Sequence, residues 1–210
     1  MPDIVLTRRL ALVGLGASAL AACGKTGSGG GAAGAMPDDM SLGNPKAKVT
    51  VVEYASVSCP VCGRWYRDNW DTFKAKYVDT GKIHFIYREM LVGGTDEMAA
   101  AASGFLLARC AGAGNYFKVV DAIYNDQTAL FADPRGTLLN VAKSMGMTEA
   151  QFDSCTRDSA SLDALTKRVQ ANAAKDNISA TPTFVINGKA LEAGYQPLSA
   201  IEAAIAAAGG

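Results

Sequence analysis

Histidine, net charge and long apolar runs are all scarce in this sequence. His84 is the single histidine among 210 residues. This weighs against a metal site built on imidazole ligands, and it leaves one candidate base for a Ser–His or Cys–His catalytic pair. Lys and Arg together number 20, as do Asp and Glu, so the chain lacks the positive charge that would hold nucleic acid. The 49% of hydrophobic residues is nevertheless enough for a packed core.

The longest apolar stretch indicates an export signal. It runs over the 13 residues Leu10–Ala22 after Arg8 and Arg9, whereas a membrane-spanning helix needs about 20 residues. Its end, Leu20-Ala21-Ala22-Cys23, resembles the lipobox of bacterial lipoproteins, in which the signal is cut before an acylated cysteine. We therefore expect a signal peptide over residues 1–22 and a lipid anchor at Cys23 that holds an exported protein on the periplasmic side of a bacterial membrane. The alternative is an ordinary secretory signal with an incidental cysteine.

The segment after Cys23 is rich in Gly, Ser and Ala, and we expect residues 23–41 to form the anchor and a flexible linker. Four further cysteines remain for the folded part, at positions 59, 62, 110 and 155. An even number in an oxidising compartment suggests two pairs. Cys59 and Cys62 have a C-x-x-C spacing that suits a redox dithiol or half of a zinc site. Because Cys110 and Cys155 are far apart in sequence, the zinc alternative is weak, no metal is expected, and the natural pairs are 59–62 and 110–155.

The first half of the folded part has a strand–helix–strand pattern. The apolar run Val49–Tyr54 predicts a strand buried on both faces. Pro60 suits the first position of a helix that we expect to continue to Tyr77, and Ile83–Tyr87 predicts a second strand.

Helical patterns dominate from Thr95 to about Asn177. Thr95 is a candidate N-cap followed by acidic residues, Asp133-Pro134 opens another helix, and Thr148 with Gln151 has the spacing of a capping box. The chain then returns to strand at Thr183–Ile186. The pair Asn187-Gly188 predicts a hairpin turn, a return strand over 190–193 and a final helix over 198–208.

Three stretches together carry a family resemblance. They are Leu42–Pro45, Val51–Ser56 running into Cys59-Pro60-Val61-Cys62, and Ala180–Gly188 with its Thr181-Pro182-Thr183-Phe184. With these motifs the sequence resembles the DsbA-like thiol–disulfide oxidoreductases over residues 38–208. The resemblance implies an α/β thioredoxin fold in two parts, residues 42–94 and 178–210, that are separated by an all-helical insertion over residues 95–177.

The cysteine pair is the expected reaction centre. At a helix N-terminus Cys59 would be stabilised as a thiolate, and Cys62 would be the buried resolving thiol. The dipeptide between the two cysteines, Pro60-Val61, would tune the redox balance of the pair and face the substrate. The resemblance implies a cis bond before Pro182, with Thr181 and Pro182 binding an extended substrate chain.

Three further positions have expected roles. In the family an acidic residue at the position of Glu53 lies beneath the cysteines and moves protons; the alternative is a solvated edge-strand side chain. His84 is expected to be a structural histidine with its hydrogen bonds satisfied. A Cys110–Cys155 disulfide would stabilise the insertion by about 3–4 kcal/mol, the alternatives being a second redox pair or free thiols.

These expectations combine into a lipid-tethered, monomeric dithiol oxidase without a cofactor. Its partners would be unfolded or partly folded secreted proteins and a membrane thiol oxidase that resets the pair. Val61 stands where the strongest oxidants of the family have His, which favours a milder oxidant, and Thr181 is commoner in reducing relatives. The alternatives are a reductase or isomerase kept reduced by a membrane partner, and a non-catalytic peptide-binding lipoprotein.

Overall fold

The computed structural model describes residues 38–209, so the expected signal peptide, the anchor Cys23 and most of the linker lie outside the described residues. A five-stranded mixed sheet forms the centre, in the order β1-β3-β2-β4-β5. The strands are β1 (Met40–Gly43), β2 (Val49–Ala55), β3 (Ile83–Glu89), β4 (Thr183–Ile186) and β5 (Lys189–Ala190). Only the β2–β3 pair is parallel; the other three pairs of neighbouring strands are antiparallel.

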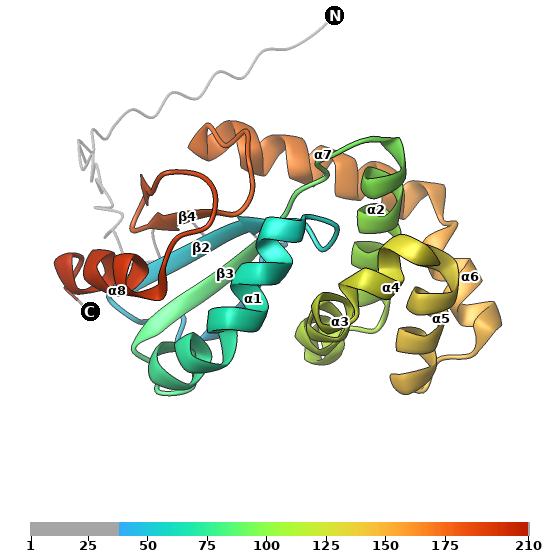
Figure 1. Ribbon diagram of the computed structural model, residues 1–210, viewed down its shortest axis with the longest axis horizontal. Coiled ribbons are helices and arrows are strands. Elements are labelled where there is room, and N and C mark those ends of the chain that lie inside the picture. The colour runs from blue at the N-terminus through green and yellow to red at the C-terminus, as the bar shows by residue number, and fades with distance from the viewer. Residues whose placement is uncertain (1–37, 210) are drawn as a thin grey trace, which may run out of the picture.

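The described chain also contains α-helices and one π-helical segment (Figure 1). They are α1 (Pro60–Phe73), its π-helical continuation η1 (Lys74–Val78), α2 (Thr95–Cys110), α3 (Ala113–Asn125), α4 (Gln127–Ala132), α5 (Pro134–Ser144), α6 (Glu149–Thr156), α7 (Ser159–Asp176) and α8 (Leu198–Ala207). Helices α2 to α6 gather beside the sheet, and the long α7 returns from them along the sheet (Figure 1). From β2 onward this is the predicted order of βαβ, helical insertion and ββα.

Alternate residues of the sheet enter two separate apolar cores. The larger core contains Val51 and Phe85 together with the aromatic residues of α1, among them Trp65 and Trp70. The smaller core lies on the other face, where residues such as Tyr54 pack against α7. Every residue of β2 and β3 is buried, because both faces are covered and both edges of each strand are paired.

Three local predictions need correction. The short edge strand β1 was not predicted. Its four residues pair with β3, and so short a strand carries little periodic signal. The return strand is Lys189–Ala190 rather than residues 190–193. Thr95 is the first helical residue of α2, and Gly94 is the N-cap.

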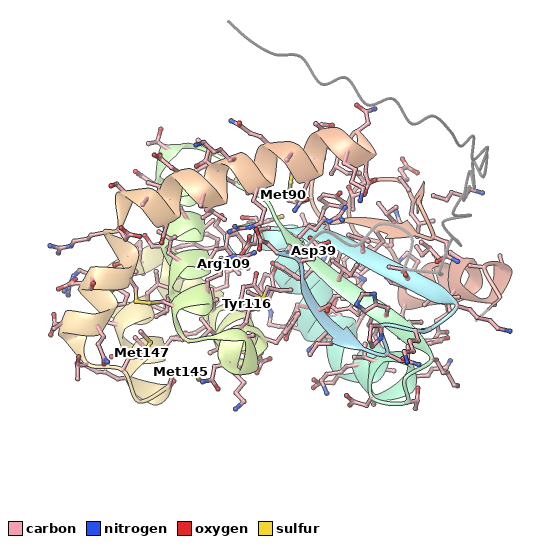
Figure 2. All side chains as sticks on the ribbon, turned by 180° about the vertical axis from the view of Figure 1, so that it is seen from behind. Asp39, Met90, Arg109, Tyr116, Met145 and Met147 are labelled. Atoms are coloured by element: carbon pink, nitrogen blue, oxygen red, sulfur yellow. A yellow bond between two sulfur atoms is a disulfide. The ribbon has the colours of Figure 1, made fainter. Side chains whose placement is uncertain are left out.

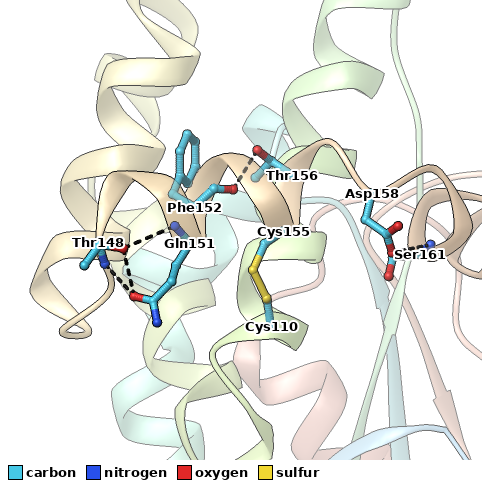
Figure 3. Close-up of a disulfide and its surroundings, with 8 residues drawn as sticks. All are labelled: Cys110, Thr148, Gln151, Phe152, Cys155, Thr156, Asp158 and Ser161. Atoms are coloured by element: carbon cyan, nitrogen blue, oxygen red, sulfur yellow. Dashed lines mark hydrogen bonds between the residues drawn. A yellow bond between two sulfur atoms is a disulfide. The ribbon is translucent and has the colours of Figure 1, made fainter.

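Other local predictions are confirmed. Asn187 and Gly188 both have positive φ, 47° and 82°, as a type I′ hairpin turn requires. Thr148 and Gln151 form the capping box of α6 (Figure 3). Figure 3 also shows the disulfide that joins Cys110, the last residue of α2, to Cys155 of α6.

Two buried charges at the end of β3 join the sheet to the surrounding elements. The Arg88 guanidinium contacts Asp39 and Asp176 at 2.9 Å each. Glu89, which points the other way, accepts hydrogen bonds from the insertion: from Arg109 at 2.6 and 2.9 Å, Arg168 at 3.0 Å and Tyr116 at 3.1 Å. Figure 2 labels Asp39, Arg109 and Tyr116 in this region between sheet and insertion.

Among residues 38–209, no helix has both the length and the apolar character needed to cross a bilayer.

The Glu89 cluster yields a stability prediction. Replacing Glu89 with Ala leaves two arginines without their buried partner, so we expect the free energy of unfolding to fall by about 3–5 kcal/mol. Denaturant unfolding of the reduced and oxidised proteins measures this loss. The matched control is Glu149→Ala, which removes an exposed ion pair with Arg135 and should cost about 1 kcal/mol or less. Equal losses in the two variants would contradict the role assigned to Glu89.

Candidate active site

Cys59 lies where the chain leaves β2 and enters α1. It is the N-cap residue of α1, with φ −81° and ψ 119°, and Pro60 follows at the first helical position. Its Sγ accepts a hydrogen bond from the backbone N–H of Cys62 at 3.4 Å. Cys59 is mostly buried, with 8% of the residue exposed, and it lines an open cavity.

The surroundings of Cys59 favour its thiolate. They lower its pKa from 9.0 to about 6, chiefly because the Cys62 thiol donates a hydrogen bond to it, and burial only partly opposes this. Hydrogen bonds from the Thr181 side chain and from the N–H groups of Val61 and Cys62 add to the effect. The N–H groups of Val61 and Cys62 are donors that a helix N-terminus leaves free.

The pKa of Cys62 is shifted in the opposite direction. It lies one turn into α1 and is fully buried. Burial, then the hydrogen bond to Cys59 and the negative charge of that thiolate, raise its pKa well above 9.0. The two sulfurs are not bonded to each other in this structure, so it represents the dithiol form. One thiol of the pair is thus ready to ionise and the other is held protonated.

The loop before β4 faces Cys59. Its Thr181-Pro182 peptide bond is cis, as the resemblance implies. The Thr181 carbonyl oxygen lies 3.6 Å from the Cys59 sulfur. Pro182 is buried and Thr181 is partly exposed, so part of the Thr181 backbone lies beside the reactive sulfur at the surface.

Glu53 is buried on the central strand. It is 1% exposed and its register partners are Tyr87 of β3 and Phe184 of β4, so the solvated edge-strand alternative does not hold. Its Oε2 has no hydrogen-bond partner among the described residues. Burial, and secondly the charge on Cys59, raise the pKa of Glu53 from 4.5 to about 8. The carboxyl group therefore holds a proton at neutral pH.

Several polar side chains beneath the cysteines were not predicted from the sequence. Tyr87 and Tyr124 share a hydrogen bond of 2.8 Å, and Tyr124 donates to the Ser56 carbonyl at 3.2 Å. Burial raises the pKa of both tyrosines. Gln127, the first residue of α4, donates to backbone carbonyls on either side of Ser58. A glycine within α1, Gly63, is the one sequence feature that could have indicated a close contact there.

A cavity of about 430 Å³ opens beside the reactive thiol. Its lining comes from the start of α1, the loop before α2, and α4: Ser58, Cys59, Pro60, Val92, Gly93, Gly94, Glu97 and Phe131. Val61 and Phe131 are unusually exposed for apolar residues, at 37% and 45%. The surface around Cys59 therefore carries exposed apolar side chains beside the charged Glu97.

The structure brings together Cys59, Cys62, Pro60, Val61, Thr181, Pro182 and Glu53, and it leaves Cys110 and Cys155 in the insertion. His84 lies on β3, 5% exposed. The prediction that its hydrogen bonds are satisfied is wrong, since Nδ1 has no partner within the described residues. Burial lowers its pKa. Trp65, Tyr66 and Trp70 belong to the core.

Comparisons with known proteins also indicate a thioredoxin-like protein. A family model described as Thioredoxin matches residues 35–207. The Rickettsia conorii protein named "Putative protein-disulfide oxidoreductase RC0029" is 30% identical over 171 residues, which are 80% of this chain and 59% of that protein. The chain thus spans about three fifths of that relative.

Solved structures share the fold. Wolbachia pipientis alpha-DsbA1 superposes with a TM-score of 0.73 at 25% identity, covering 82% of this chain and 92% of that one. A protein-disulfide isomerase from Novosphingobium aromaticivorans gives a TM-score of 0.67 at 21% identity, covering 82% and 98%, which supports the fold alone. The chain has a thioredoxin fold with a helical insertion, and it belongs to the thioredoxin family as one of its DsbA-like members.

Proposed function

We propose that this chain is an extracytoplasmic thiol–disulfide oxidoreductase that donates a Cys59–Cys62 disulfide to reduced cysteine pairs of secreted proteins. The observation that carries the proposal is the opposed ionisation of the two thiols. Cys59 is stabilised as a thiolate at the N-cap of α1, while Cys62 is buried and protonated. A stabilised thiolate favours the reduced form of the pair and hence transfer of the disulfide to a client.

The exchange has two steps. A client thiolate attacks the Cys59 sulfur, forms a mixed disulfide and displaces Cys62, which takes up a proton. The second client thiolate then attacks the client sulfur of the mixed disulfide and displaces Cys59 as a thiolate. The client loses two electrons and gains a disulfide, and the Cys59–Cys62 pair gains those electrons. In this proposal Thr181 and Pro182 bind the client backbone, Pro60 and Val61 contact its side chains, and a membrane thiol oxidase restores the disulfide.

Glu53 is proposed as the proton source for Cys62. It is protonated at neutral pH and close enough to the pair for the charge on Cys59 to act on its pKa. A lipid anchor at Cys23 would keep the domain near the membrane oxidase, and Cys110–Cys155 would serve as a structural disulfide.

A client-oxidation assay tests the proposal. We expect the oxidised protein to form a disulfide in a reduced, unfolded client peptide with two cysteines, and Cys59→Ser to abolish the reaction, because the variant cannot form the Cys59–Cys62 disulfide that is transferred. The control is Cys110→Ala/Cys155→Ala, assayed where it is folded, which should keep the activity. If the wild-type protein formed no disulfide in the client, while wild type and Cys59→Ser bound the client equally well, the non-catalytic peptide-binding alternative would be favoured.

Equilibration of the same pair with glutathione decides the direction of exchange. The proposal requires a potential well above about −270 mV, the value for thioredoxin, toward about −120 mV. A value at or below that of thioredoxin would favour the reductase or isomerase alternative.

The lowered pKa of Cys59 predicts a pH profile. In the dithiol form the rate of alkylation by iodoacetamide should reach half its maximum near pH 6, because the thiolate is the nucleophile. An ordinary thiol would reach that point near pH 9. The corresponding stabilisation of the folded dithiol form is complete above pH 9 and is lost as the pH falls through 6. A midpoint above pH 8 in the alkylation profile, measured with Cys59→Ser as the blank, would contradict the assigned environment.

Replacing Glu53 with Gln tests the proton transfer. The substitution keeps the shape of the side chain and removes its titratable proton, so we expect client oxidation at pH 7 to slow by about 10²-fold, as for loss of a general acid. The ratio of the wild-type rate to the variant rate, in which ionisation of the client thiol cancels, should also fall as the pH rises and Glu53 ionises; burial raises this pKa, to about 8 in the dithiol form. Stopped-flow fluorescence measures both the rate at pH 7 and its pH dependence. Glu192→Gln, at an exposed carboxylate, is the control, and an unchanged pH profile in Glu53→Gln would remove Glu53 from the mechanism.

A further inference from the structure

One side chain of the helical insertion reaches the backbone on both sides of the reactive cysteine. Gln127, the first residue of α4, is 4% exposed. Its Nε2 donates to the Val57 carbonyl at 2.8 Å and to the Cys59 carbonyl at 3.0 Å. It lies 68 residues beyond Cys59 in sequence, so this is a long-range contact between the insertion and the redox loop.

The two carbonyls define the conformation of the N-cap. The Cys59 carbonyl also accepts the N–H of Gly63 at 3.0 Å, the first bond of α1. In the described part of the chain, no other donor reaches the Val57 carbonyl. A single amide group therefore joins the loop just before Cys59 to the first turn just after it, in addition to the bond from the Cys59 N–H to the Ser56 carbonyl within the loop at 3.0 Å.

The surface of α1 leaves room for this amide. A Cβ atom on Gly63 would lie 2.2 Å from Gln127 Oε1 and 2.7 Å from its Cδ. Glycine is among the least favourable residues in the interior of a helix. Its presence one position after Cys62 is explained by the buried Gln127 side chain that packs against it.

Neighbouring contacts hold the same part of the insertion against α1. Tyr124, three residues before Gln127, donates to the Ser56 carbonyl at 3.2 Å. Its own carbonyl accepts from Arg67 of α1 at 2.8 Å, and its ring stacks on Tyr66 of α1 at 4.6 Å between centroids. The start of α4 is thus fixed relative to the reactive cysteine.

We propose that Gln127 is a positioning residue through which the helical insertion holds Cys59 in its N-cap conformation and so sets the redox balance of the Cys59–Cys62 pair. The inference rests on the proposed function, since it concerns the same dithiol. Gln127 acts through the backbone: with the Val57 and Cys59 carbonyls fixed, Cys59 Sγ stays 3.4 Å from the N–H of Cys62. When the loop is free to move, the thiolate loses the donors that stabilise it.

The test compares three variants. Gln127→Met keeps the length and volume of the side chain and removes both hydrogen bonds. Gly63→Ala leaves Gln127 in the chain but occupies the space in which its amide lies. The control is Gln151→Met, which removes the capping box of α6 in the same insertion without touching the redox loop.

Two readouts report on Cys59 itself and need no client protein. Thiolate absorbance near 240 nm as a function of pH gives its pKa. Equilibration with glutathione, in which the disulfide and two glutathione thiols exchange with the dithiol and one glutathione disulfide, gives the potential. We expect both Gln127→Met and Gly63→Ala to raise the Cys59 pKa by about one, which is a tenfold decrease in its acid dissociation constant, and to lower the potential by up to about 30 mV for that tenfold change. Gln151→Met should change neither.

The outcomes separate positioning from a purely structural role. If Gln127→Met folds with less stability but with the wild-type pKa and potential, the proposal is overturned. If Gln127→Met does not fold, the pKa and the potential of Gly63→Ala are used instead, and wild-type values in that variant overturn the proposal. A shift of equal size in Gln151→Met would also overturn it, because any weakening of the insertion would then suffice. Failure of client oxidation with wild-type protein would refute the proposed function and leave these two measurements interpretable.

Discussion

The buried central strand β2 is the constraint on which the rest of this structure depends. It is paired on both edges and covered on both faces, so its position and register are fixed. The chain leaves it directly into the loop that carries Cys59. The same strand holds Glu53 beneath the cysteines and Tyr54 against α7. A displacement of β2 would therefore change both the reactive loop and the packing of the insertion.

Burial acts on the three titratable groups of the site in different ways. Cys62 and Glu53 have few polar partners, so loss of water raises the pKa of each and keeps each protonated. Cys59 is also partly buried, but hydrogen bonds to its sulfur outweigh that effect and lower its pKa. In the proposed exchange Cys59 leaves the client sulfur as a thiolate, and a stabilised thiolate leaves faster. The sequence of one strand and one helix start produces this contrast within ten residues.

The helical insertion is attached to the sheet at places that differ in chemistry. Glu89 binds two arginines and a tyrosine of the insertion at the end of β3. Gln127 binds the loop before α1. The Cys110–Cys155 disulfide, in contrast, lies within the insertion and joins α2 to α6. The ionic and amide contacts thus join the insertion to the sheet and the redox loop, whereas both ends of the disulfide lie within the insertion.

Local sequence signals determined much of this protein. The C-x-x-C with Pro60, the Asn187-Gly188 turn and the Thr148–Gln151 capping box each involve neighbouring residues whose conformational preferences are intrinsic. The resemblance added the cis bond at Pro182. Tertiary structure alone decided the pairing of β1 with β3, the partners of Glu89 and the hydrogen bonds of Gln127. Those contacts join residues far apart in the chain. The local sequence around a polar residue does not show whether its side chain is solvated or buried against a distant carbonyl.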